Sequence, residues 1–161
     1  APAFFSTGLP VERVKVLPGA LEALLALQEA GITLVLVSNQ SGVSRGYFTE
    51  DQVMAIQARM MELLPGVEFA SFEYCFHTPD EGCPCRKPQP LMILRAAHRL
   101  GLDLSRSVMI GDRVSDVGAG QAAGCKTLFL NTDAELIAEM KPDHAAASLA
   151  DSVEWVLEEL L

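Results

Sequence analysis

Residues 32–42 read Ile-Thr-Leu-Val-Leu-Val-Ser-Asn-Gln-Ser-Gly, a nearly continuous apolar run followed by five small or polar residues. Such a run is typical of a β-strand that is buried on both faces, as strands of parallel sheets are. In α/β folds with this kind of sheet, ligands bind outside the carboxyl ends of the strands. The stretch therefore predicts an α/β fold and places the polar residues after Val37 at a candidate ligand site.

Alternating helical and strand patterns flank this strand. Apolar residues recur at three- and four-residue intervals in five segments, which predicts helices at 17–31, 49–63, 90–100, 115–123 and 149–161. Short apolar runs predict three further strands, at 69–76, 107–110 and 127–130. In the last helix, Trp155 and the neighbouring acids are expected on the outer face. Strands that alternate with helices predict right-handed crossovers and a mainly parallel sheet.

The composition limits the classes of partner. The chain has 161 residues, 50% of them hydrophobic, and a formal net charge of −9. We expect one domain over residues 1–161, and the acidic excess argues against long nucleic acids, which bind surfaces that neutralise phosphates. No apolar run reaches the ~18–20 residues that cross a membrane, and the first residues show no secretory signal. We therefore expect a cytoplasmic monomer without a nucleic-acid or membrane partner.

Three of the four cysteines lie close to a histidine in the segment 75–85. The candidate metal ligands are Cys75, His77, Cys83 and Cys85, spaced as Cys-x-His and Cys-x-Cys. Residues two apart point to the same side of an extended segment, and turn-forming residues at 79–82 let the two pairs face each other. Four sulfur and nitrogen ligands suit a structural Zn²⁺ with no open position. The alternative is a set of redox-sensitive or buried thiols, and Cys125 is expected to be a small core residue.

Polar and basic residues follow the predicted strands at two further places. Side chains and backbone N–H groups after Val37 can hold phosphate oxygens; they belong to Ser38, Asn39, Gln40 and Ser41. Directly after the cysteine segment, Arg86 and Lys87 form the only adjacent pair of Lys or Arg residues, and a guanidinium fork beside a compact ammonium suits a phosphate clamp. The alternatives are ordinary turn residues and a solvated basic pair.

Two acids follow the predicted strand at 107–110. Asp112 comes directly after it, and Asp116 stands four residues later. Mg²⁺ prefers one or two carboxylates together with phosphate oxygens and water, so we expect Asp112 to bind Mg²⁺. Asp116 is either a second ligand or a charge that stabilises the start of the next helix. The residues by themselves predict a Mg²⁺-assisted, phosphate-handling α/β domain with a structural zinc loop.

Three of these motifs resemble, in order and spacing, the haloacid-dehalogenase (HAD) superfamily: 38–42, the cysteine segment running into Arg86-Lys87-Pro88, and Gly111-Asp112-x-x-x-Asp116. More closely, they resemble its zinc-containing branch of D-glycero-D-manno-heptose-1,7-bisphosphate phosphatases and the related histidinol phosphatases. The resemblance implies a three-layer Rossmann-like fold, catalytic Mg²⁺, structural Zn²⁺, and hydrolysis of a small sugar bisphosphate to its 1-monophosphate. It implies that Lys87 neutralises charge on the transferring phosphoryl group, Asn39 and its neighbours bind phosphate, and Arg86 and Arg113 contact the substrate.

The family's chemistry also uses a pair of aspartates at the end of its first strand, one as nucleophile and one as general acid and base. No Asp precedes Asp51 in this sequence. We therefore expect the 161-residue polypeptide to be inactive or nearly so, either as a piece of a phosphatase or as a non-catalytic phosphate-binding or interaction protein. With the first strand absent, neighbouring strands would keep unpaired backbone groups unless Phe4-Phe5, Val14-Lys15-Val16 or a partner chain fills the gap.

Overall fold

Parallel strands form the centre of the molecule. The computed structural model describes residues 5–6 and 11–161. β3 (Leu34–Asn39) pairs with β4 (Phe69–Cys75). β5 (Val108–Gly111), β6 (Lys126–Phe129) and β7 (His144–Ala145) form a second parallel group, in that order. The two groups make up the central layer of the fold.

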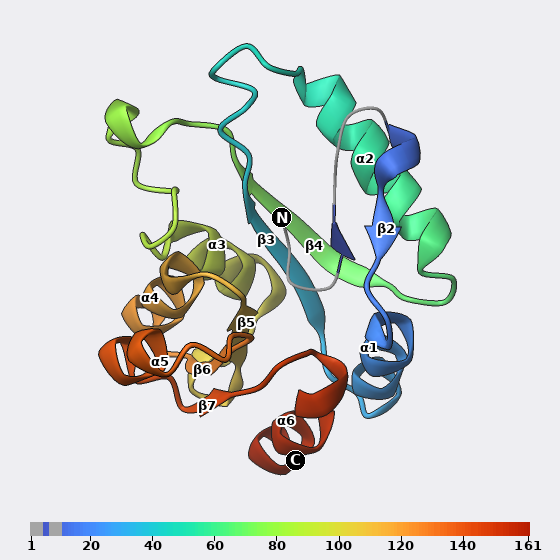
Figure 1. The fold of residues 1–161 in the computed structure, drawn as a ribbon, viewed down its shortest axis with the longest axis vertical. Coiled ribbons are helices and arrows are strands. Elements are labelled where there is room, and N and C mark those ends of the chain that lie inside the picture. The colour runs from blue at the N-terminus through green and yellow to red at the C-terminus, as the bar shows by residue number, and fades with distance from the viewer. Residues whose placement is uncertain (1–4, 7–10) are drawn as a thin grey trace.

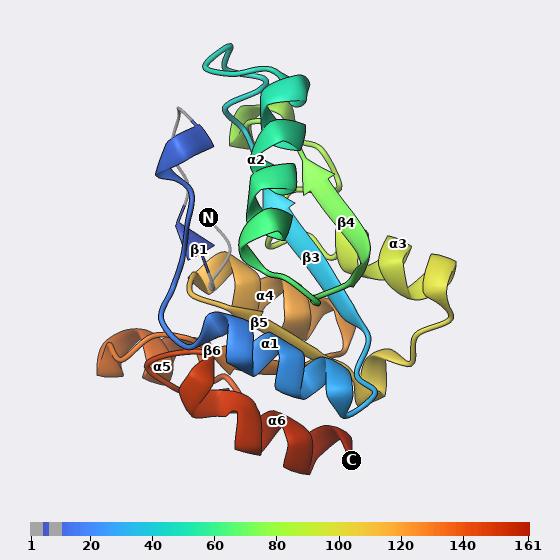
Figure 2. The same ribbon diagram turned by 90° about the vertical axis from the view of Figure 1, so that its right-hand side faces the viewer.

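Helices cover both faces of these strands (Figure 1, Figure 2). One layer contains α3, which packs on β4, and α4, which packs on β5 and β6. The other contains α1, α2 and α6, and α5 packs beside α4. The helices are α1 (Ala20–Glu29), α2 (Glu50–Leu63), α3 (Leu91–Leu100), α4 (Val114–Ala123), α5 (Ala134–Met140) and α6 (Val153–Leu160). Short 3-10 turns lie at Val11–Arg13, Pro79–Glu81, Leu104–Arg106 and Ala150–Ser152. The predicted α/β class with parallel strands is confirmed.

The predicted helices and strands are present, further short elements were not predicted, and one side chain was misplaced. Thr49 caps α2, because its hydroxyl accepts from the N–H of Gln52 while the Gln52 side chain accepts from the N–H of Thr49. α5 and β7 were not predicted from the sequence. The placement of Trp155 on the outer face is wrong: its ring packs on the core and stacks on His144, with ring centroids 4.9 Å apart.

The first described residues form a small sheet of their own. β1 (Phe5–Ser6) pairs antiparallel with β2 (Lys15–Val16), and the Val14 side chain is buried in the main core. Within residues 5–6 and 11–161, β1 and β2 therefore pair with each other and not with β3 or β5. Phe4, the other residue considered for the gap, lies outside the described residues.

The core fixes the strands from which the candidate site projects. Leu27, Met60, Leu64 and Leu128 are each at most 2% exposed and belong to one apolar cluster. Burying a side chain of this size contributes ~1.5–3 kcal/mol to stability. Among the described residues, every helix is too short or too polar to cross a lipid bilayer.

Candidate active site and metal cluster

The four predicted metal ligands meet at the end of β4. Their ligand atoms all lie within 4.8 Å of one another. The Cys75 sulfur is 2.9 Å from that of Cys85, 3.5 Å from that of Cys83 and 3.5 Å from Nδ1 of His77. A tetrahedral zinc with bonds of ~2.3 Å would hold its sulfurs ~3.8 Å apart, so a small expansion lets the cluster take an ion. The Cys-x-His and Cys-x-Cys pairs therefore face each other as their spacing predicts.

The pKa values of two thiols in this cluster are shifted in opposite directions, one by burial and the other by hydrogen bonding. Burial, reinforced by the Cys85 thiol, raises the pKa of Cys75 to about 12. Burial also acts to raise the pKa of Cys83, but the backbone N–H groups of Arg86 and Cys85 and the neighbouring thiols outweigh it and lower that pKa to about 7. Because a metal ion binds the thiolate, Cys83 offers a ligand that is already partly deprotonated at neutral pH.

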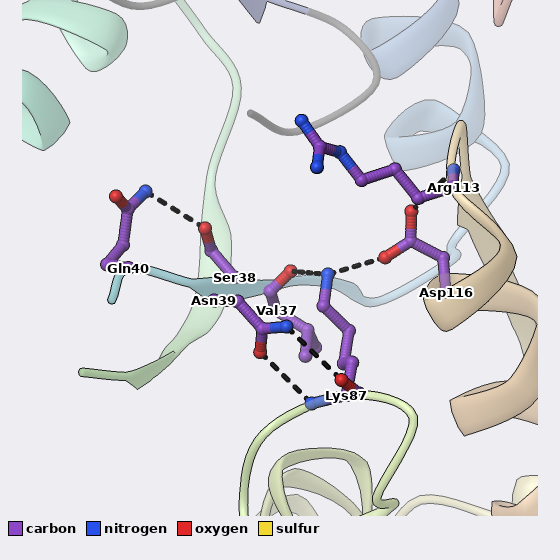
Figure 3. Close-up of polar contacts among 7 residues, drawn as sticks. All are labelled: Val37, Ser38, Asn39, Gln40, Lys87, Arg113 and Asp116. Atoms are coloured by element: carbon purple, nitrogen blue, oxygen red, sulfur yellow. Dashed lines mark hydrogen bonds and ion pairs between the residues drawn. The ribbon is translucent and has the colours of Figure 1, made fainter. Parts of the chain in front are cut away.

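Lys87 connects β3 to the start of α4, the helix that follows β5 (Figure 3). Its amine donates to the main-chain oxygen of Val37 at 3.2 Å and to Oδ1 of Asp116 at 2.5 Å. The side chains of Lys87 and Asp116 are only 11% and 6% exposed, so water screens their interaction weakly. An ammonium group has three N–H donors. Two have partners among the described residues, which leaves the third for a ligand at the strand ends.

Polar side chains at the end of β3 hold this arrangement in place (Figure 3). Oδ1 of Asn39 accepts from the backbone N–H of Lys87 at 3.0 Å, and Nδ2 donates to the Lys87 main-chain oxygen at 3.4 Å. Gln40 donates to the hydroxyl of the buried Ser38 at 3.0 Å. Ser41 lies in the following turn, where its main-chain oxygen accepts from Arg45. Of the four predicted phosphate-loop residues, Asn39 is thus the one that fixes Lys87.

The two predicted magnesium ligands have different surroundings. Asp112 is exposed directly after β5. Asp116 is 4% exposed, and its second oxygen accepts from the backbone N–H of Arg113 at 3.0 Å, at the start of α4. Gly111 makes room for it, because a Cβ at that position would lie 2.2 Å from the Asp116 side chain. The geometry favours the helix-start role for Asp116 and leaves Asp112 as the available carboxylate.

The two predicted substrate arginines lie on different elements. Arg86 donates to the main-chain oxygen of His77 at 3.3 Å, which ties the guanidinium to the metal cluster. Arg113 is exposed at the start of α4, with its side chain extending beside the Lys87–Asp116 pair in Figure 3. Of the two arginines, Arg113 thus extends beside the Lys87–Asp116 pair, while Arg86 is held at the metal cluster.

Several contacts of the site were not predicted. The Ser44 hydroxyl donates to Glu81 at 2.7 Å and so joins the loop after β3 to the metal-binding segment. Glu81 also accepts from the backbone N–H of Thr78 at 2.6 Å, a Thr-x-x-Glu capping box whose spacing is visible in the sequence. Another contact is the Val37 carbonyl on Lys87, for which no side-chain pattern gives a signal.

Known proteins are similar to this chain in sequence and in fold. Residues 84–155 match the family model described as HAD-hydrolase-like. The D-glycero-beta-D-manno-heptose-1,7-bisphosphate 7-phosphatase of Pasteurella multocida is 38% identical over 152 residues, which are 88% of this chain and 83% of that protein. The protein of the same name from Pseudomonas aeruginosa is 38% identical over 118 residues, 72% of this chain and 66% of that protein. The crystal structure of D,D-heptose 1,7-bisphosphate phosphatase from B. bronchiseptica, complexed with magnesium and phosphate, matches with a TM-score of 0.87 and 30% identity over 99% of this chain and 95% of that chain. The chain therefore belongs to the HAD-like hydrolases, in the branch of the heptose-1,7-bisphosphate phosphatases.

Proposed function

We propose that this site is that of a phosphatase which removes the 7-phosphate from D-glycero-D-manno-heptose 1,7-bisphosphate and leaves the 1-monophosphate, and that the 161-residue chain by itself binds this substrate but turns it over at trace rates at most. The observation that carries the proposal is the Lys87 amine, which lies where β3 and β5 end and has two partners among the residues that the structure describes, so its third N–H can bind a phosphate oxygen. The names of relatives that are 38% identical support the same reaction. The substrate class is a small phosphorylated sugar, and the reaction is hydrolysis of a phosphoric monoester.

The roles of the basic and polar residues follow from the negative charge of the phosphoryl group that is transferred. Negative charge is spread over the oxygens of a phosphoryl group during transfer, and a cation already in position stabilises it without reorganisation. Lys87 is that cation, and Asn39 positions it through both of its backbone groups. The polar side chains of Ser38, Gln40 and Ser41 bind the phosphate. The backbone N–H of Gln40 has another partner, because it donates to the main-chain oxygen of Cys75 at 2.6 Å. Arg86 and Arg113 contact the remainder of the bisphosphate.

Asp112 is the residue that would hold Mg²⁺. It is exposed beside the phosphate site, whereas both oxygens of Asp116 already have protein partners. A site with one carboxylate fits Mg²⁺, which completes its shell with phosphate oxygens and water. A bound Mg²⁺ would supply Lewis-acid polarisation of the phosphoryl oxygens. The metal cluster at 75–85 would hold a structural Zn²⁺, because four protein ligands leave no position open for water.

Binding and turnover are to be measured separately. The polypeptide has no Asp before Asp51, so we expect it to lack the nucleophile for turnover while it keeps the residues for binding. We expect calorimetry with Mg²⁺ to show that the 161-residue chain binds the heptose bisphosphate, while phosphate release stays at trace rates. Lys87→Met should bind at least tenfold more weakly, since a charged hydrogen bond contributes ~1.5–3 kcal/mol. Lys126→Met removes a partly exposed lysine on β6 and should bind like the original chain.

Equal affinity of Lys87→Met and the original chain would contradict the role of Lys87. Rapid phosphate release by this polypeptide would contradict the expectation about turnover and would remove the non-catalytic alternative. Histidinol phosphate, titrated in the same experiment, tests the second substrate, and tighter binding of it would replace the heptose bisphosphate in the proposal.

A further inference from the structure

The loop that follows β3, residues 41–48, is tied to the metal-binding segment by a single side chain. Within the loop, the N–H of Arg45 donates to the main-chain oxygen of Ser41 at 3.0 Å, and further backbone bonds of this kind fold the loop back on itself. Among the described residues, the bond from the Ser44 hydroxyl to Glu81, at 2.7 Å, is the one hydrogen bond that joins this loop to a segment distant in the sequence. The position of the loop therefore depends on what holds Glu81.

Glu81 is held by the turn that separates the two pairs of metal ligands. It ends the 3-10 turn Pro79–Glu81, which lies between His77 and Cys83 in the chain. One of its oxygens, Oε1, accepts from the loop hydroxyl, and the other, Oε2, accepts from the backbone N–H of Thr78 at 2.6 Å. An ion bound to His77 and Cys83 would fix both ends of this turn, because metal ligands that come together order the chain between them.

We propose that Ser44 and Glu81 are positioning residues, through which a metal ion in the cluster orders the loop 41–48 and so strengthens phosphate binding at the end of β3. Two sites are coupled when both favour the same state of one element. Zinc favours the ordered loop by fixing the turn of Glu81, and phosphate favours it by binding Ser41. The coupling is reciprocal, so bound phosphate must raise the zinc affinity by the same factor. The effect on phosphate rests on the proposed function, whereas the order of the loop does not.

Amide hydrogen exchange on the zinc-loaded 161-residue protein tests the order of the loop. Ser44→Ala removes the hydroxyl, and we expect it to speed exchange of the Arg45 and Tyr47 amides by about fivefold or more while the amides of β4 stay protected. Ser44→Thr keeps a hydroxyl and should exchange like the original chain. Ser105→Ala is the matched control and should leave the loop unchanged, because Ser105 also donates to an exposed carboxylate, that of Asp103 at 2.6 Å, in the turn before β5.

Zinc affinity, measured by competition with a chelating dye, tests the connection to the metal. Ser44→Ala should bind zinc about threefold more weakly than the original chain or worse, and Ser105→Ala should bind it equally tightly, because only Ser44 contacts the turn between the ligands. Saturating heptose bisphosphate should raise the zinc affinity of the original chain by about threefold or more and leave that of Ser44→Ala unchanged. A hydroxyl that only stabilises its own loop would not change zinc binding in this way.

The inference is overturned if Ser44→Ala leaves either the exchange of the loop amides or the zinc affinity unchanged, or if the bisphosphate raises the zinc affinity equally in both proteins. An original chain that binds no bisphosphate would contradict the proposed function and the effect on phosphate that rests on it. Exchange and zinc affinity, which need no phosphate ligand, would still test the link between the loop and the metal.

Discussion

The ammonium of Lys87 and the carboxylate of Asp116 neutralise each other at the strand ends, where Asp116 is buried and Lys87 is largely buried. Removing one partner of a buried pair leaves an uncompensated charge, which typically costs ~3–5 kcal/mol. We expect Lys87→Met and Asp116→Asn each to lower the free energy of unfolding. In the double variant, ~1–3 kcal/mol of the summed loss should be recovered, because neither charge is left alone. Urea denaturation of the four proteins measures this coupling, and strictly additive losses would show that the two groups do not interact.

Gly111 lets the end of β5 lie close to Asp116. A methyl group at this position would stand 2.2 Å from the Asp116 side chain, so the carboxylate must move away from Lys87 or the backbone must shift. We expect Gly111→Ala to lower the free energy of unfolding by ~1–3 kcal/mol, as overpacking does. Ser115→Ala, in the first turn of α4, serves as the control and should change the free energy of unfolding by less than ~0.5 kcal/mol. Equal stability of the two variants in urea would show that the close approach of Gly111 to Asp116 does not affect the free energy of unfolding.

At the scale of the element, the segment 75–87 carries both the metal cluster and Lys87. Protein purified without added metal should contain close to one zinc per chain by elemental analysis. Cys85→Ser should lose the zinc and melt at a lower temperature, because a metal that binds only the folded state stabilises it. Cys125→Ser, outside the cluster, should keep the zinc. A zinc-free protein whose melting temperature is unchanged by a chelator would favour the alternative of free thiols.

The sequence predicts those elements whose pattern is local. The apolar run of β3 and the spacing of the cysteine segment predict a buried strand and a metal cluster, because each depends on residues a few positions apart. The contacts of Lys87 with Asn39 and Asp116 join residues 48 and 29 positions apart, so the order of motifs placed them at one site but could not show which groups bond. Trp155 was misplaced because its partner His144 lies on a two-residue strand that has no apolar pattern.

At the scale of the whole molecule, an acidic chain keeps a small basic site. The net charge is −9, yet Lys87 and Arg113 lie beside each other at the strand ends, with Arg86 adjacent to Lys87 in the chain. A local cluster of cations in an acidic body suits a small, doubly phosphorylated ligand better than a long polyanion, which a −9 surface repels. The absence of a nucleic-acid partner stays a prediction.

The central claim is that phosphate binds at the Lys87 amine where β3 and β5 end. A crystal structure of the 161-residue protein with Mg²⁺ and the heptose bisphosphate tests it most directly. The account predicts a phosphate oxygen within hydrogen-bond distance of Lys87 Nζ and Mg²⁺ on Asp112. A phosphate bound elsewhere on the molecule, with the contacts of Lys87 to Val37 and Asp116 unchanged, would contradict it.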